Sequence, residues 1–150
     1  MTAAVVTGAL TVAALNALCA AIGCWRWLRR RPGRDFWLLL RAAQAAVIVY
    51  VAAVGVLAAE SHYPREHLFY LYALLPVAVA FMAEQYRAVA AQSILDQRGL
   101  EGAAAVGALP QSQQHEVVGA ILRRELGVMT LSALVVAFLA LRAASTAHGF

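Results

Sequence analysis

The sequence has few charged residues and no lysine. Only 13% of its 150 residues are charged, whereas 63% are hydrophobic, and all twelve basic residues are arginine. Soluble domains usually contain about a quarter charged residues, so this shortage excludes an ordinary soluble domain. The net charge of +4 does not indicate a nucleic-acid partner, because the arginines lie at the ends of apolar runs, where membrane topology places them.

Cysteine and catalytic motifs are also scarce. The two cysteines, Cys19 and Cys24, lie in the first apolar run and do not share a helix face well, which argues against a structural disulfide. Neither has a histidine at helical spacing that would favour a catalytic thiol. There is no Gly-rich phosphate loop, no HExxH motif and no histidine inside an apolar run that would suit a haem. Common enzyme classes therefore have no motif in this sequence.

Long hydrophobic runs are what the sequence has instead. A helix needs about 20 residues to cross a hydrocarbon core of about 30 Å. Runs of this length lie at about residues 3–25, 36–59, 66–90 and 120–144. Pro76 predicts a kink in the third run, and the Gly-, Ala- and Gln-rich residues 98–114 predict a flexible cytoplasmic loop. We predict one all-α membrane domain over residues 1–150, a four-helix transmembrane bundle in up-down order.

The first connection predicts the orientation of the chain. It is crowded with arginines and flanked by aromatic residues, as at a membrane interface: Arg26, Arg29, Arg30, Arg31 and Arg34 beside Trp25, Trp27, Phe36 and Trp37. Basic loops stay in the cytoplasm, so we expect the N- and C-termini outside and the plasma (inner) membrane of a bacterium as the location. Residues 21–24 loosely resemble a lipoprotein cleavage box, but the positive region that should precede the apolar run is missing.

Polar side chains near the inner ends of the second and third runs form the first candidate site. Arg41 lies about 8 Å into the second helix, and Glu84 lies at a similar depth in the third. A charge at membrane depth costs about 3 kcal/mol or more unless it pairs or reaches water, so we favour an Arg41–Glu84 salt bridge. Gln44 and Arg87 complete the set. The alternative is that Glu84 binds a proton or cation.

Histidines and acids on the outer side form a second candidate site. His62, Glu66 and His67 have side chains that suit Zn²⁺, Cu²⁺ or Ni²⁺, with Glu60 and His148 as further candidates. Their spacing matches no established metal motif. The alternative is a solvated loop whose acids lie favourably near a helix N-terminus.

Basic residues at the inner interface are candidate contacts for anionic lipid headgroups. Guanidinium groups attract such headgroups without a special pocket. The candidates are Arg29, Arg30, Arg31, Arg123 and Arg124.

In size and number of spans the chain is similar to the four-helix family of microsomal glutathione transferases and leukotriene synthases. Arg41-Ala42 and Gln44 match part of that family's second-helix signature, whereas the acidic residue before the arginine and the Asn and Glu after it are absent. The resemblance implies a four-helix bundle that forms trimers. We carry over no activity from it.

Three functions remain open on the sequence. The leading hypothesis is a non-enzymatic membrane component, either a homo-oligomer or an accessory subunit of a larger membrane complex, with Arg41 and Glu84 fixing helix register. The second is a small channel or carrier for a proton, cation or small solute that uses Glu84. The third is a membrane-embedded enzyme with an outer His/Glu site. The sequence does not identify a cofactor.

Overall fold

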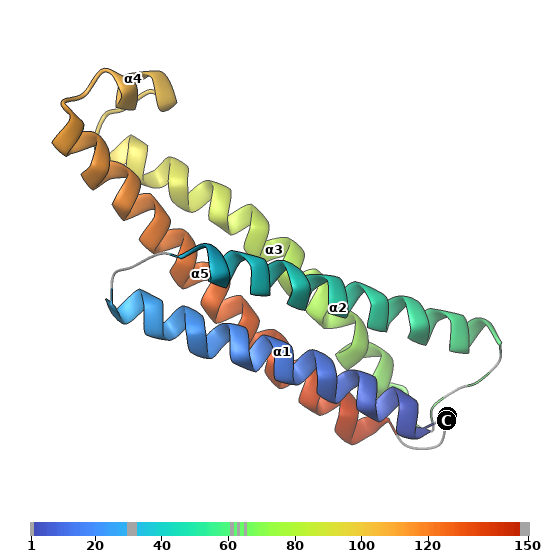
Figure 1. Ribbon diagram of the computed structural model, residues 1–150. Coiled ribbons are helices and arrows are strands. Elements are labelled where there is room, and N and C mark those ends of the chain that lie inside the picture. The colour runs from blue at the N-terminus through green and yellow to red at the C-terminus, as the bar shows by residue number, and fades with distance from the viewer. Residues whose placement is uncertain (1, 30–32, 61, 63, 65, 148–150) are drawn as a thin grey trace.

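The computed structural model describes residues 2–29, 33–60, 62, 64 and 66–147, and these ranges contain helices and no strand. The five helices are α1 (Thr2–Arg29), α2 (Arg34–Ala59), α3 (Leu68–Gln97), α4 (Ala103–Gly107) and α5 (Gln111–Thr146) (Figure 1). α4 is a short helix between the two longest ones. The predicted all-α fold class is confirmed.

Four of these helices, α1, α2, α3 and α5, are long and apolar enough to cross a membrane. Large apolar side chains lie on the outside of the bundle as well as in its interior. On the outside, Leu38 is 71% exposed and Phe81 is 65% exposed. Helices that are apolar all round are stable in lipid, because the backbone polar groups are satisfied within each helix. The four helices thus have the length and composition of the spans of a small membrane protein. The position of its termini relative to the membrane stays a prediction.

α5 is the central helix of the bundle. It packs along both α1 and α3, whereas α2 packs mainly on α1 and meets α3 at few points. One buried cluster fills the end of the bundle that holds the α2–α3 connection and includes Val5, Tyr50, Phe69 and Val136. A second cluster fills the opposite half and includes Cys19, Phe36, Leu126 and Met129. α2 and α3 are the least buried of the four spans, and they meet each other at few points.

A glycine allows the closest approach of three helices in the second cluster. A Cβ atom on Gly23 of α1 would collide with the side chains of Thr130 on α5 and Phe36 on α2. Small residues at such crossings let membrane helices pack by close van der Waals contact. Gly23 thus sets the spacing of α1, α2 and α5.

The helices α3 and α5 extend beyond the other two. At about 1.5 Å per residue, the 36 residues of α5 span about 54 Å, well over a hydrocarbon core of about 30 Å. We call residues 92–122 the α3–α5 extension; it projects past the ends of α1 and α2 (Figure 1). Ile94 and Val117 are buried within it, and Arg98 bonds to Glu116 at 2.8 Å.

The predicted spans 66–90 and 120–144 correspond to longer helices. α3 begins at Leu68 and continues to Gln97, and α5 begins at Gln111, well before residue 120. The predicted loop 98–114 includes α4 and the start of α5. The helices continue past the apolar runs, and Ile94 and Val117 are still buried there. Pro76 lies inside α3, which continues through it as helix.

Candidate functional site

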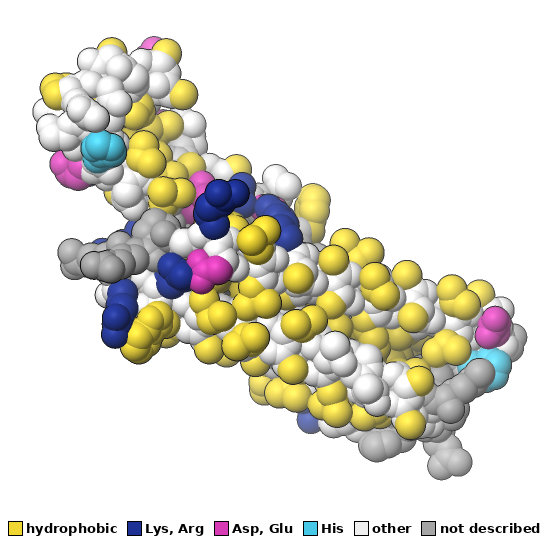
Figure 2. Space-filling model, in the orientation of Figure 1, with side chains coloured by type: hydrophobic (Ala, Val, Ile, Leu, Met, Phe, Trp, Pro, Cys, Tyr) yellow, Lys and Arg dark blue, Asp and Glu magenta, His cyan; other side chains and the backbone are white. Residues whose placement is uncertain are grey.

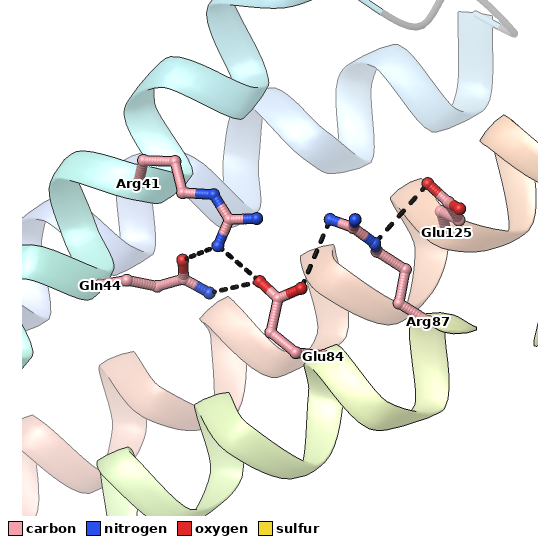
Figure 3. A network of polar contacts seen from close by, with 5 residues as sticks. All are labelled: Arg41, Gln44, Glu84, Arg87 and Glu125. Carbon is pink, nitrogen blue, oxygen red and sulfur yellow. Dashed lines mark hydrogen bonds and ion pairs between the residues drawn. The ribbon is translucent and has the colours of Figure 1, made fainter. Parts of the chain in front are cut away.

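A network of polar side chains joins α2, α3 and α5 at the end of the bundle nearest the extension (Figure 3). Arg41 of α2 donates hydrogen bonds to Gln44 Oε1 at 2.6 Å and to Glu84 Oε1 at 2.7 Å. Gln44 Nε2 also donates to Glu84 Oε1, at 3.1 Å. The predicted contact between Arg41 and Glu84 is thus present, and Gln44 strengthens it.

The second oxygen of Glu84 extends the network to α5. Arg87 Nη1 lies 3.4 Å from Glu84 Oε2, and Arg87 Nε lies 3.8 Å from Glu125 Oε2. The guanidinium of Arg87 also lies over the ring of Trp37, 5.3 Å from its centroid. The two arginines of the network, Arg41 and Arg87, balance the charge of its two glutamates, Glu84 and Glu125. Their side chains connect the three helices α2, α3 and α5.

The two ends of this network differ in exposure. The side chain of Glu84 is 28% exposed and that of Glu125 is 17% exposed, whereas the side chain of Arg41 is 55% exposed. Arg41 lies seven residues after the start of α2, about 10 Å along the helix. Its guanidinium is thus paired on one side and uncovered on the other.

A hollow of about 260 Å³ lies beside Arg41 and Glu84. Apart from these two residues and Gln44, its lining is apolar: Val47, Ile48, Val77, Ala80 and Phe81. The hollow lies between α2 and α3 because these helices meet at few points. The α2–α3 face, which we define by these eight residues, combines an uncovered charge with an unfilled apolar surface.

The outer histidines and acids do not form a comparable cluster. Glu66 and His67 are exposed, and the Nδ1 atom of His62 is buried without a hydrogen-bond partner among the described residues. Within the described part of the chain, no group of three or more His, Cys, Asp or Glu side chains is placed to hold a metal ion. His148 lies outside the described residues. The metal site therefore stays a prediction without supporting geometry.

Three of the predicted lipid-contacting arginines, Arg29, Arg123 and Arg124, lie near one end of the bundle. Arg29 lies over the Trp25 ring, 4.0 Å from its centroid, and Arg123 and Arg124 are exposed on α5. Arg30 and Arg31 lie outside the described residues. On the face shown in Figure 2, arginine side chains gather where the bundle meets the extension, while hydrophobic side chains cover α1 and α2. This charge distribution agrees with an interfacial position for the arginines.

Two acids outside the predicted site residues also form ion pairs at this end of the bundle. Glu125 pairs with Arg87 on α3. Asp35 pairs with Arg26 across the α1–α2 connection. The signal for Glu125 was its position at the inner end of a span, where an acid calls for a partner; which arginine it meets depends on the packing of α3 against α5.

Comparisons with protein families, curated proteins and solved structures find no match to this chain. Fold and geometry therefore define the class, a small four-helix membrane protein, and carry the functional argument.

Proposed function

We propose that this protein is a non-enzymatic component of a membrane assembly and associates with its partner, a second copy or an unlike chain, through the α2–α3 face. The observation that carries the proposal is the half-exposed Arg41 beside the apolar hollow. In a monomer that guanidinium faces lipid on one side. A neighbouring helix would cover it and fill the hollow.

The polar network supports a structural role for its charges. Glu84 already receives hydrogen bonds from Arg41 and Gln44 and an ion pair from Arg87. Such pairing fixes the register of α2 against α3 and α5. This matters because α2 and α3 have few apolar contacts that could fix their register. Interhelical polar contacts in membranes stabilise a fold modestly but specify which surfaces meet.

Two phenylalanines of equal exposure provide the test. Phe81 lies on the α2–α3 face and is 65% exposed, and Phe138 lies on α5 and is 64% exposed. We expect Phe81→Ala to weaken association between labelled copies, or with a co-purifying chain, by about tenfold, the upper part of the range for one buried aromatic contact. Phe138→Ala should leave the association unchanged.

Energy transfer between donor- and acceptor-labelled proteins in vesicles measures association between copies of the chain. Retention of the co-purifying chain measures association with an unlike partner. Equal effects of the two substitutions would contradict the assignment of this face.

A conduit for protons or cations is the second candidate function, because Glu84 lines the hollow between α2 and α3. This function requires Glu84 to exchange its ion during transport. Ion flux into proteoliposomes that is lost in Glu84→Gln, with the assembly intact, would favour the conduit over the structural role. Flux that is absent, or equal in the two proteins, would favour the structural role.

A further inference from the structure

A polar hollow lies directly against an apolar groove where α1 packs on α5. The hollow has a volume of about 500 Å³ and is lined by Arg26 of α1, Arg98 and Glu116 of the extension and Arg123 of α5. The groove has a volume of about 550 Å³, and its lining is almost entirely apolar. Trp27 lines both of them, so the two spaces adjoin.

Small side chains create the apolar groove. Ala17 and Ala21 of α1 and Gly127 of α5 leave the space that larger residues would fill. The hydroxyl of Thr130 also lines the groove, but it donates to the Leu126 carbonyl oxygen at 2.6 Å and so needs no partner there. From Ala17 to Trp27 the groove runs about 15 Å along α1, which is half of a hydrocarbon core of about 30 Å. Its length thus matches the depth of one membrane leaflet.

The charges that line the hollow are not fully balanced. Arg98 pairs with Glu116 at 2.8 Å, and Arg26 pairs with Asp35. Arg123 forms no ion pair or hydrogen bond with the described residues. The exposed guanidinium of Arg123 therefore gives this hollow a surplus of positive charge next to an interfacial tryptophan. Guanidinium groups in such positions bind phosphate oxygens well.

We propose that the hollow and the groove together bind one anionic phospholipid, with its phosphate at Arg123 and one acyl chain along α1 and α5. Basic pockets between membrane helices on the cytoplasmic side bind anionic headgroups. The polar hollow fits the headgroup and the adjoining groove fits the chain, in the order in which an inner-leaflet lipid presents them. This site lies away from the α2–α3 face and does not depend on the assembly proposed there.

Native mass spectrometry of the delipidated protein with phosphatidylglycerol or phosphatidylcholine tests the charge requirement. We expect one phosphatidylglycerol to bind at least several-fold more tightly than phosphatidylcholine. Arg123→Gln should weaken that binding by about tenfold, as for loss of one charge-assisted hydrogen bond. The matched control is Arg142→Gln, because Arg142 is also exposed on α5 but lies near the other end of that helix, over the ring of Tyr72. Equal losses in the two variants, or equal binding of the two lipids, would overturn the proposal.

A second pair of variants tests the chain requirement. Ala21→Leu fills the groove from an exposed position on α1, whereas Gly55→Leu adds the same side chain on α2 where a Cβ meets nothing within 4 Å. We expect only Ala21→Leu to weaken phosphatidylglycerol binding, with unfolding temperatures confirming that both variants fold. Cys24 lines the same groove, so bound lipid should slow its alkylation by a maleimide. Competition by free glycerol phosphate, with Ala21→Leu unaffected, would show a soluble anion site and contradict a lipid site.

Discussion

At the scale of single residues, the polar network was the most predictable part of the molecule. Arg41 and Glu84 lie at similar depths in antiparallel helices, and the cost of an unpaired charge in lipid favours their contact. Helix geometry also brings Gln44 to the same point, three residues after Arg41. The partner of Glu125 was not predictable, because it lies on a helix remote in sequence. Depth in a helix can be counted from the sequence, but rotation and neighbour choice depend on packing.

The pairing of Arg41 with Glu84 predicts a measurable coupling. We expect Arg41→Gln and Glu84→Gln each to destabilise the fold, and the double variant to be less destabilised than the sum of the two. Hydrogen bonds between membrane helices average about 0.6 kcal/mol, and a charged pair supported by Gln44 should give a coupling of about 1 kcal/mol. Reversible unfolding in mixed micelles measures the free energies. Strict additivity would show that the two side chains do not stabilise the fold together.

The tight packing around Gly23 predicts that adding a single methyl group there strongly lowers the stability of the fold. Gly23→Ala should destabilise the fold by about 1–3 kcal/mol, because Thr130 and Phe36 must move to admit the new Cβ. Gly55 is the control, since a Cβ there meets nothing within 4 Å. Gly55→Ala should be neutral or stabilising by up to about 1 kcal/mol. Unfolding measurements on both variants decide the matter, and a neutral Gly23→Ala would contradict the packing of α1 against α2 and α5.

At the scale of elements, four long apolar helices followed from the sequence, and α3 and α5 are longer than their apolar spans. Hydropathy marks where apolar composition stops, and this is the edge of the membrane rather than the end of the helix. α5 begins at Gln111, and Val117 in the α3–α5 extension is still buried. No run of apolar residues in the sequence predicts this part of the helix. The residues from 98 to 114 were expected to form a loop, since their Gly and Pro content indicates turns.

The extension can be tested by hydrogen exchange in lipid nanodiscs. We expect residues 92–97 and 115–119 to exchange slowly, because their amides are hydrogen-bonded within α3 and α5. The amides of Glu101, Gln111 and Ser112 have no backbone acceptor among the described residues and should exchange fast. Local opening sets these rates, so the contrast should be about tenfold or more. Uniformly fast exchange from 98 to 119 would instead support the flexible loop that composition alone predicts.

At the scale of the whole molecule, uneven packing is the feature that points to assembly. α5 packs against two helices, whereas α2 and α3 leave a hollow between them with Arg41 half exposed at its edge. Neither the hollow nor the exposure follows from the sequence, because both depend on how far apart α2 and α3 lie. An assembly that covers the α2–α3 face would remove both at once.

The most direct test of this account is the mass of the protein extracted from its native membrane together with the surrounding lipid. We predict a complex of fixed stoichiometry, either several copies of the 16.0 kDa chain or one chain with an unlike partner, that is weakened by Phe81→Ala and not by Phe138→Ala. A single 16.0 kDa chain over the full range of protein concentration would contradict the proposed role as a component of an assembly.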